Sequence, residues 1–535
     1  MLLPAAVILG LGLGCVLSAQ VPFSSPGDWE WDLDTPPNPN STHHLVFETA
    51  SSLLQQWPNT RYRNGHTLIP AYVPTGTLLY HGRSDSNVPS TPEWVATDPE
   101  HSLNFCRGRP RPPNAPSYPA PNPEHDAPEN TNTNSSNCWH LTLVTTRPLT
   151  ILYFDGSSAA KMPYGSMDSQ DIVAWGKVEK ERYFEERERL GVLCDWGRGV
   201  GVEGFVRMEM DFEIMLCDFT AGVRVESMLN LEEVKRGRVG PPLHTNAEVR
   251  MDIEVIRAGA RHNHFPGETR VKLDYTKFIS FYDTDLVPSL VGVRAQLGGR
   301  LEHRLEGISA RDIGAVMGRL ESAFSGSGGS GSGVDWQTLI KVVKDRYADR
   351  LELVRDLVNL NTTKMASRDV QGQLTAMVAP YLLASQNFNA TYKLCATTHT
   401  RYIRETLAMT PSEKLLLGAV EGTTKEICRG VIRMWGWGVD HDDGDVNELV
   451  GAWKEEIERL MNWLDWSVWL KCRPQCNWDE MCYLPTWPMF RWGPGGRPGP
   501  PGRGPPPPED VDEDEEPDWI DPQPVCRKIV GDVDF

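Results

Sequence analysis

The hydrophobic period changes once along this chain of 535 residues, and that change limits the fold more than any other feature. In the N-terminal half, residues 140–155 alternate apolar and polar side chains and are rich in β-branched residues, which predicts two strands or one bent strand. Residues 204–219 alternate in the same way and predict another strand. Between them, residues 169–191 have helical spacing, with Ser169 as a cap.

The C-terminal half has a different pattern. Residues 336–360, 412–435 and 448–470 each repeat apolar side chains at helical spacing. Six tryptophans of this half recur at such positions, which favours a packed core over a sugar-binding surface: Trp435, Trp437, Trp453, Trp463, Trp466 and Trp469. We therefore predict an α+β domain followed by a helical domain.

Segments of low complexity give the expected domain boundaries. Residues 325–333 read SGSGGSGSG, a flexible linker by composition, between an α+β domain at 45–324 and a Trp- and Cys-rich helical domain at 335–492. Residues 107–137 are rich in Pro and Asn and predict a flexible surface insertion. Residues 493–518 join polyproline to an acidic block and predict a disordered tail.

The N-terminus predicts entry into the secretory pathway. Met1–Leu17 is uncharged and apolar, and Ser18 and Ala19 are small residues of the kind found at a cleavage site. We predict a signal peptide over residues 1–19, with an uncleaved anchor as the alternative. Elsewhere no apolar run has spanning length, so the mature chain is predicted to have no membrane span.

Cysteine usage agrees with export. The chain has 11 cysteines, and removal of Cys15 with the signal leaves 11 − 1 = 10, an even number that predicts disulfides. Cys472, Cys476 and Cys482 lie close together without a nearby histidine, which favours disulfides over zinc. We predict a secreted, extracellular or cell-wall location, or the lumen of the secretory pathway. Asn-x-Ser/Thr sequons predict N-glycans at Asn40, Asn134, Asn361 and Asn389.

Composition excludes several classes of partner and enzyme. The formal charge of −19 argues against binding to nucleic acid or to an anionic membrane. There is no Gly-x-Ser-x-Gly, no His-Glu-x-x-His and no phosphate-binding glycine loop. The acidic run Asp440–Asp445 lacks the alternating ligands of a calcium loop and predicts a solvated connection between helices. No metal site is predicted.

One ordered set of motifs points to chemistry. Residues 77–82 predict a short strand that ends in His81-Gly82. A strand at residues 94–96 follows, and Asp98-Pro99 then begins a helix, with Asp98 as its cap. Ser102 and Phe105 lie one turn apart on that helix.

This order resembles ADP-ribosyltransferases of the poly(ADP-ribose)-polymerase-like, or diphtheria-toxin, type. That family has His-Gly on its first core strand, then an aromatic-x-Ala strand, then a helix with Ser-x-x-Tyr. Trp94-Val95-Ala96 and Ser102-Leu103-Asn104-Phe105 match in the same order, with Trp94 and Phe105 where tyrosines are usual. The family's catalytic glutamate opens a later apolar strand, which Glu213 fits; Glu209, four residues earlier on the same predicted strand face, is the alternative.

The resemblance implies an NAD-binding sheet domain and a role for each residue. Gly82 would offer backbone groups to the nicotinamide carboxamide, and Ser102 a hydroxyl. Trp94 and Phe105 would flank the nicotinamide ring. NAD would be the co-substrate, and the acceptor stays undefined.

The two catalytic roles would fall to His81 and Glu213. His81 would donate to a ribose hydroxyl, and the Glu213 carboxylate would stabilise an oxocarbenium-like ribose as nicotinamide leaves. The same residues also suit a different function. A histidine at a strand end, aromatic core residues and a solvated strand face would equally occur in a non-catalytic secreted or cell-wall interaction protein, including one with a degenerate form of this fold. In composition the chain also resembles large secreted proteins of filamentous fungi.

Overall fold

A computed structural model describes most of the chain. The described residues are 31–106, 138–162, 164–231, 251–326, 331–360, 364–382, 387–441, 445–485 and 521–530. The predicted signal peptide, the insertion at 107–137, the tail at 493–518 and residues 442–444 of the acidic run therefore lie outside the described residues, as do the sequons at Asn134 and Asn361.

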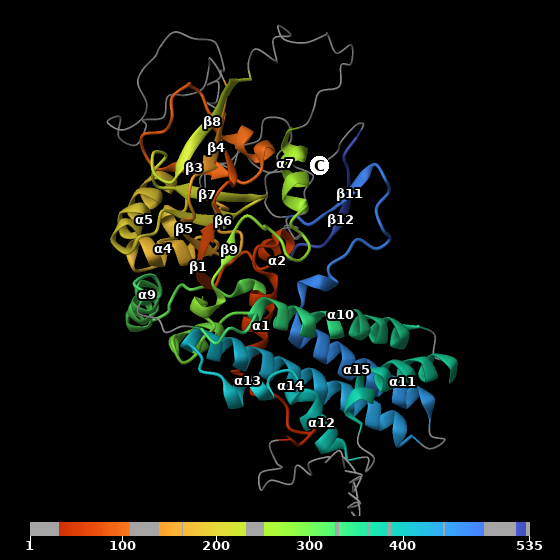
Figure 1. Cartoon of the computed structure of the whole chain (residues 1–535). Coiled ribbons are helices and arrows are strands. Elements are labelled where there is room, and N and C mark those ends of the chain that lie inside the picture. Colours follow the sequence, from red (N-terminus) through yellow and green to blue (C-terminus); the bar gives the residue numbers. More distant parts are fainter. Residues whose placement is uncertain are drawn as a thin grey trace, which may run out of the picture.

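The N-terminal part is built on one mixed sheet that curls strongly (Figure 1). Its strand order is β10-β1-β5-β6-β7-β3-β2-β4-β8, and β9 pairs with β1. Only the β5–β6 pair is parallel among the described strands. The strands are β1 (Thr67–Val73), β2 (Leu78–Arg83), β3 (Glu93–Ala96), β4 (Trp139–Thr145), β5 (Leu149–Phe154), β6 (Gly204–Met208), β7 (Phe212–Leu216), β8 (Val223–Asn230), β9 (Lys272–Leu273) and β10 (Ile279–Ser280).

Two predicted strand regions are each divided. Residues 140–155 form two strands, β4 and β5, which lie apart in the sheet. Residues 204–219 form the antiparallel hairpin β6–β7, so the prediction of one continuous strand is wrong. The turn lies at residues 209–211, where Asp211 accepts a hydrogen bond at Oδ1 from the backbone N–H of Phe212 at 2.7 Å. Glu209 is therefore in the turn, and it does not share a strand with Glu213.

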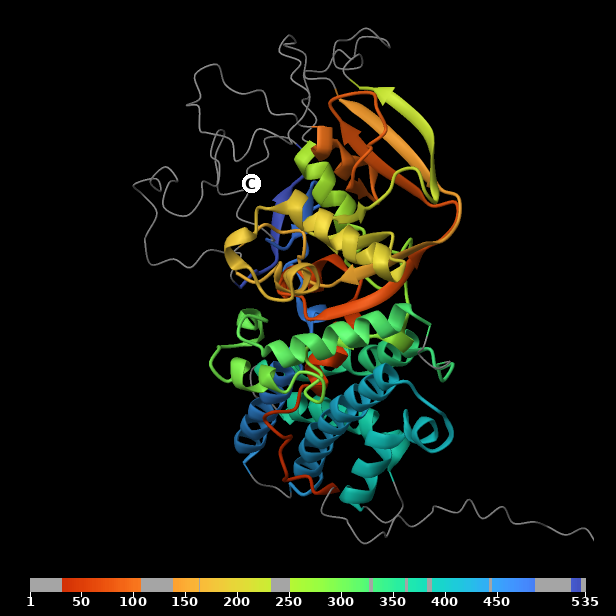
Figure 2. The ribbon, with the colours of Figure 1, turned by 90° about the vertical axis from the view of Figure 1, so that its left-hand side faces the viewer.

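The helices of this part pack at several places around the sheet: α9 contacts β1 and β10, whereas α3 and η2 contact β2 (Figure 2). The predicted helix at 169–191 is two helices, because Gly176 ends the first one with φ 70°. Ser169 lies inside the first helix, whose N-cap is Met167, so the capping prediction is also wrong. The helices of this part are α1 (His43–Ser52), α2 (Gln56–Arg61), α3 (Pro99–Ser102), α4 (Asp168–Trp175), α5 (Glu186–Val200), α7 (Met251–Ala260), α8 (Ser289–Arg294) and α9 (Ala310–Phe324), with 3-10 turns η2 (Leu103–Cys106), η3 (Lys180–Arg182), η4 (Tyr275–Lys277) and η5 (Arg300–Glu302).

The C-terminal part is a helical bundle, as the sequence predicts (Figures 1 and 2). The longest helix begins with a capping box in which Thr410 and Glu413 exchange hydrogen bonds with each other's backbone. Trp453 and Trp466 are fully buried, and Trp435 is nearly so, which places them in the core. The helices are α10 (Trp336–Asn359), α11 (Lys364–Val378), α12 (Phe388–Thr397), α13 (Arg401–Thr406), α14 (Pro411–Val439) and α15 (Val446–Leu464), with 3-10 turns η6 (Ala379–Tyr381) and η7 (Ser467–Trp469).

The first helix ties the two parts together. α1 packs against α14 and α10 of the bundle, and the buried residues of both parts form one continuous core. Glu48 on α1 is completely buried and accepts a hydrogen bond from Lys344 of α10 at 2.6 Å. The Gly/Ser segment is also held at its end, because the backbone N–H of Ser332 donates to Glu413 at 2.8 Å.

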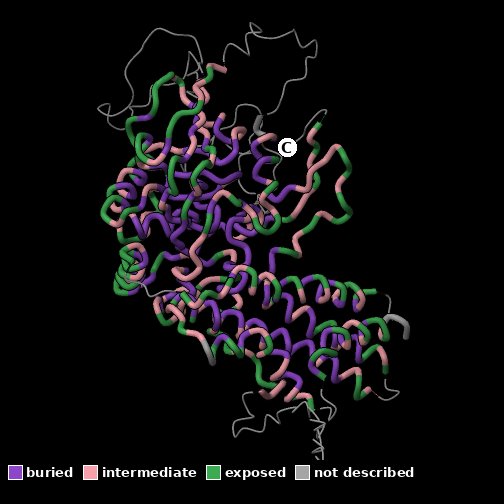
Figure 3. The backbone as a smooth tube through the Cα atoms, in the orientation of Figure 1, coloured by how far each residue is buried: buried purple, intermediate pink, exposed green. Residues whose placement is uncertain are grey.

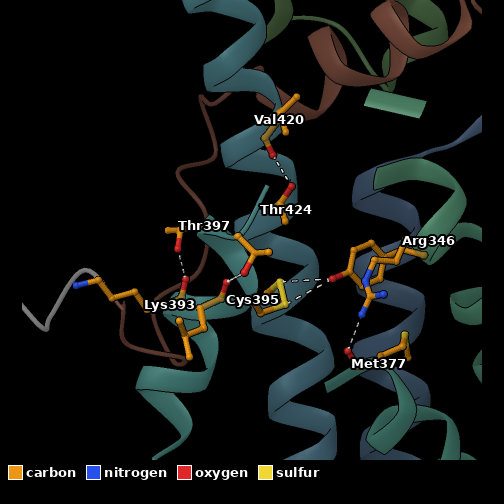
Figure 4. Close-up of a disulfide and its surroundings, with 11 residues drawn as sticks. Arg346, Met377, Lys393, Cys395, Thr397, Val420 and Thr424 are labelled. Atoms are coloured by element: carbon orange, nitrogen blue, oxygen red, sulfur yellow. Dashed lines mark hydrogen bonds between the residues drawn. A yellow bond between two sulfur atoms is a disulfide. The ribbon is translucent and has the colours of Figure 1, made fainter. Parts of the chain in front are cut away.

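Disulfides link ten cysteines among the described residues. The bonds are Cys106–Cys138, Cys194–Cys217, Cys395–Cys428, Cys472–Cys482 and Cys476–Cys526. This confirms the prediction of disulfides over zinc, and it agrees with folding in an oxidising compartment. Figure 4 shows the bond that joins α12 to α14, next to the contact between Arg346 and Met377.

Two surface features bear on the expected secretory location. Among the described helices, none is both long enough and apolar enough to cross a membrane. The two sequon asparagines that the structure describes, Asn40 and Asn389, are both exposed.

A second, two-stranded antiparallel sheet of β11 (Glu480–Tyr483) and β12 (Val525–Lys528) lies beside the first sheet and carries two of the disulfides.

Candidate functional site

The strands that carry the predicted catalytic residues are neighbours in the sheet. β2 pairs with β3, and β3 pairs with β7, each in antiparallel fashion. The register places Ala96 opposite Tyr80 on one side and opposite Glu213 on the other. Because opposite residues of paired strands point to the same face, these three side chains form one row across the sheet. The fold thus places His81, Trp94 and Glu213 on neighbouring strands. Trp94 lies on the face of Ala96 and Glu213, whereas His81, next to Tyr80 on β2, points to the opposite face.

The segment α3–η2 lies against this region and contributes the other predicted residues. Ser102 is fully buried, and its hydroxyl donates to the carbonyl of Pro99 at 2.7 Å. A Cβ on Gly82 would lie 2.7 Å from Sγ of Cys106 and still closer to the carbonyl oxygen of Ser102. Gly82 is therefore required for close approach of β2 to this segment, which occupies the space beside it.

His81 is held by its neighbours on β3. Its Nδ1 lies 2.6 Å from the carbonyl oxygen of Trp94, and its Nε2 lies 3.1 Å from Oε2 of Glu93. Only 2% of the residue is exposed. Arg83 pairs with the same glutamate at 2.9 Å. Burial would raise the pKa of Glu93, but His81 and Arg83 together bring that pKa below its ordinary value.

Glu213 also has a charged partner. Its Oε1 accepts a hydrogen bond from Nε of Arg207 at 2.7 Å, and the same guanidinium reaches Glu186 through Nη2 at 2.5 Å. Arg207 is 1% exposed and Glu213 is 6% exposed. Burial alone would lower the pKa of Arg207, yet the two carboxylates raise it, so the arginine keeps its charge. This buried triad fixes the direction of the Glu213 carboxylate.

The two predicted aromatic residues have different neighbours. Trp94 is partly buried, and the guanidinium of Arg187 lies 5.7 Å from its ring centroid and that of Arg207 6.0 Å. The Phe105 ring lies 5.9 Å from the His81 ring. The six predicted residues are therefore gathered, and their polar atoms and rings contact one another or charged neighbours.

Sequence analysis missed His101, which lies at the centre of the cluster. Its ring is 5.4 Å from the Phe105 ring, and its Nε2 is 3.8 Å from Oε2 of Glu213. Burial lowers its pKa below the ordinary value, although Glu213 and Asp98 act in the opposite direction. A neutral imidazole beside the carboxylate results. Its position directly before Ser102 was the available signal, but no spacing rule assigns a role to that position.

Glu209, the alternative carboxylate, lies in the β6–β7 turn. Burial raises its pKa to about 7, opposed by Lys161 and reinforced by Glu213. The Glu209 carboxyl therefore titrates near neutral pH. Glu213, by contrast, belongs to an ion-paired triad with Arg207 and Glu186. The turn position of Glu209 also keeps it off the row across the sheet to which Glu213 belongs.

A second charged group lies at the start of α3. Asp98, His262 and Glu268 have ligand atoms within 4.8 Å of one another, a spacing that suits a metal ion. However, Arg270 Nη2 already lies 3.1 Å from Asp98 Oδ2 and 2.5 Å from Glu268 Oε2. We assign this group as an ion-pair network that anchors α3. Asp98 is the N-cap of α3, as the sequence predicts, but its side chain makes no capping hydrogen bond.

The other group with metal-ligand spacing consists of three cysteines. Cys472, Cys476 and Cys526 all belong to disulfides, so their sulfur atoms are not available as thiolates. In the part of the chain that the structure describes, these two are the groups with such spacing.

Comparisons with known proteins cover the same region. The family model described as the YPL277C N-terminal domain matches residues 38–137 and 112–245, a stretch that includes all six predicted site residues. The Saccharomyces cerevisiae "uncharacterized protein YOR389W" is 26% identical over 85% of this chain and 83% of its own length. The "uncharacterized protein YPL277C" from the same yeast is 27% identical, over 60% of this chain and 76% of its own length.

No solved structure matches the chain. The names of these relatives state no substrate or activity. The resemblance to ADP-ribosyltransferases, and with it the assignment of NAD, therefore stays a prediction from the motifs.

Proposed function

We propose that the chain cleaves the bond between nicotinamide and ribose in NAD, either as an ADP-ribosyltransferase or as an NAD glycohydrolase. One observation supports this best. His81, Trp94 and Glu213 lie on three consecutive strands of the sheet, β2, β3 and β7. Ser102 and Phe105 approach the same place from α3–η2. The strands that carry these separate motifs are thus neighbours in the sheet, although side-chain alternation turns His81 to the face opposite Glu213.

The proposed reaction needs a carboxylate beside the ribose. The bond from ribose C1 to the nicotinamide nitrogen breaks, and both of its electrons leave with nicotinamide, which becomes neutral. The ribose becomes an oxocarbenium ion, which the negative charge of Glu213 stabilises. Water adds to that carbon and loses one proton, so the products are ADP-ribose, nicotinamide and a proton. With an acceptor nucleophile in place of water, the same step transfers ADP-ribose.

Arg207 and His101 would act as positioning residues. Arg207 holds one oxygen of Glu213, which leaves Oε2 directed toward His101 at 3.8 Å. The free oxygen is therefore the one that would face the ribose. NAD needs α3–η2 to move away from β2, since Ser102 and Cys106 fill the space beside Gly82.

That packing supports a second candidate function, a non-catalytic secreted interaction protein that keeps this arrangement for stability. His81 is 2% exposed and Ser102 is fully buried, as expected of core residues. Glu93 and Arg207 provide each proposed catalytic group with its own charged partner.

The deciding experiment is nicotinamide release from NAD by purified, disulfide-intact protein. We expect release by the wild type and a loss of about 100-fold or more in Glu213→Gln, since that variant removes the stabilising charge at similar size. Glu226→Gln on the exposed strand β8 is the matched control and should keep full activity. His81→Ala should also lose release.

The alternative predicts a different result. If the wild type releases no nicotinamide, and NAD does not raise its melting temperature, the enzymatic proposal is overturned and the interaction protein is favoured. Equal activity in the wild type and Glu213→Gln would place the chemistry elsewhere in the chain.

A further inference from the structure

A large groove lies away from the Glu213 cluster. Its volume is about 1020 Å³, at the upper end of the range of about 300–1,000 Å³ for small-molecule sites. α1 and α2 line one side, and residues 260–265 after α7 continue that wall. α10 of the bundle and the disulfide-linked residues 467–482 complete it. In Figure 1 the segments that line the groove lie between the β11–β12 sheet, α2 and α10.

Trp478 is the most unusual residue of this groove. Its side chain lines the groove, yet 87% of the residue is exposed. An exposed indole gives little to folding, because the free energy of burial scales with the apolar area that leaves water. The Cys472–Cys482 bond encloses it, and the Cys476–Cys526 bond holds the same loop to β12. The indole is therefore presented by a cross-linked and rigid loop.

Two further aromatic residues line the same groove. Phe265 is 38% exposed, and Trp57 on α2 is partly buried. Figure 3 shows the loop that carries Trp478 as mostly exposed and intermediate in burial, beside a purple core. Exposed aromatic groups that gather at one concave surface mark a binding site more often than a folding feature.

Four carboxamide side chains are among the polar groups of the groove. Gln55, Asn263, Gln475 and Asn477 all line it. Each carboxamide offers both a donor and an acceptor, which suits vicinal hydroxyl groups. Oδ1 of Asn263 is buried and has no hydrogen-bond partner among the described residues. A buried acceptor without a partner carries a desolvation cost that a ligand hydroxyl would relieve.

The three lysines of the groove are each paired with a carboxylate, and Glu480 adds a further negative charge to its lining. Lys344 pairs with Glu48 at 2.6 Å, and Lys471 pairs with Glu352 at 2.5 Å. Lys341 pairs with Asp345 on the same helix. A ligand anion would have to compete with these carboxylates in a chain of net charge −19. The groove therefore suits an uncharged ligand.

We propose that this groove binds a neutral oligosaccharide. The C–H face of a pyranose ring is apolar and flat, and it would stack on Trp478 and Phe265. The hydroxyl groups at the ring edge would exchange hydrogen bonds with Asn263 and the neighbouring amides. This binding activity is independent of the proposed NAD chemistry, since no residue of the Glu213 cluster lines the groove.

The test is calorimetric titration of the full mature chain with three uncharged hexasaccharides: laminarihexaose, chitohexaose and mannohexaose. We expect one of them to bind at a single site, and Trp478→Ala to weaken that binding by about tenfold, the effect of losing one aromatic stacking contact. Asn263→Ala should weaken it as well. Phe184→Ala is the matched control, because Phe184 is 53% exposed and lies outside the groove.

Three outcomes would overturn the proposal. The first is the absence of heat with all three sugars at millimolar concentration. The second is binding that Trp478→Ala and Phe184→Ala weaken equally. The third is binding of a sulfated oligosaccharide, used as a polyanionic probe, in preference to all three neutral ones. Each variant should keep the melting temperature of the wild type, so a loss of binding reports on the groove and not on unfolding.

Discussion

The Glu213 cluster and the Trp478 groove satisfy their functional groups in opposite ways. In the cluster, Glu213 and His81 are buried and already paired, Glu213 with Arg207 and His81 with Glu93. In the groove, an indole is 87% exposed and an amide oxygen has no partner among the described residues. The cluster therefore contributes its interactions to folding, and a ligand must break some of them. The groove can receive a ligand as it stands.

The largest effect that separates the two regions is expected at Arg207. Arg207→Met leaves Glu213 buried without its cation and Glu186 with Arg189 alone, which should lower the free energy of unfolding by about 3–5 kcal/mol. Urea unfolding of the disulfide-intact protein measures it. Arg224→Met removes an exposed ion pair with Glu226 on β8 and should cost no more than about 1 kcal/mol.

A rescue variant sharpens this result. Arg207→Met combined with Glu186→Gln and Glu213→Gln has no unpaired charge, so much of the lost stability should return. If Arg207→Met is as mild as Arg224→Met, the cluster is not a folding element, and the contrast with the groove fails.

Much of the fold, but less of the site, could be predicted from the sequence. The helical period locates α10, α14 and α15 because each buries one continuous stripe. It fails at residues 204–219, since alternation continues through a tight hairpin and hides the turn. The same error placed Glu209 on a strand with Glu213.

The part of the site that the sequence did not predict depends on contacts between residues distant in the chain. Motif order selected His81, Trp94 and Glu213, which lie on three neighbouring strands, with His81 on the opposite face from Glu213. The ion pairs that hold them, and the His262 contact with Asp98, depend on registers that no local pattern encodes. The groove combines residues from four separate segments, and Trp478 alone carried no recognisable motif.

The second prediction concerns the disulfide at the end of η2. Cys106→Ser with Cys138→Ser removes a link of sequence separation 32, and Cys472→Ser with Cys482→Ser one of separation 10. Chain entropy predicts a loss of about 4 kcal/mol for the first pair and about 3 kcal/mol for the second. The first pair should also speed hydrogen exchange in β2, because α3–η2 is released from β4. Unchanged exchange there would mean that other contacts hold the cluster closed.

The third prediction is a pH dependence specific to the cluster. The pKa of Glu209 is raised from 4.5 to about 7, so the folded state holds its proton more tightly than the unfolded chain does. This stabilisation is complete below pH 4.5 and is lost as the pH rises to about 7. Glu209→Gln should abolish this pH dependence, which amounts to roughly 1–3 kcal/mol in the free energy of unfolding. Parallel profiles for the wild type and the variant across this range would contradict it.

The smallest effect on stability is expected in the groove. Trp478→Ala should change the free energy of unfolding by no more than about 0.5 kcal/mol, since the indole buries little area. Trp453→Ala, with the same change at a residue 1% exposed, should cost about 3–5 kcal/mol. Urea unfolding compares the two directly. A large loss in Trp478→Ala would show that this indole packs within the fold, and the groove would then be closed in the same way as the Glu213 cluster.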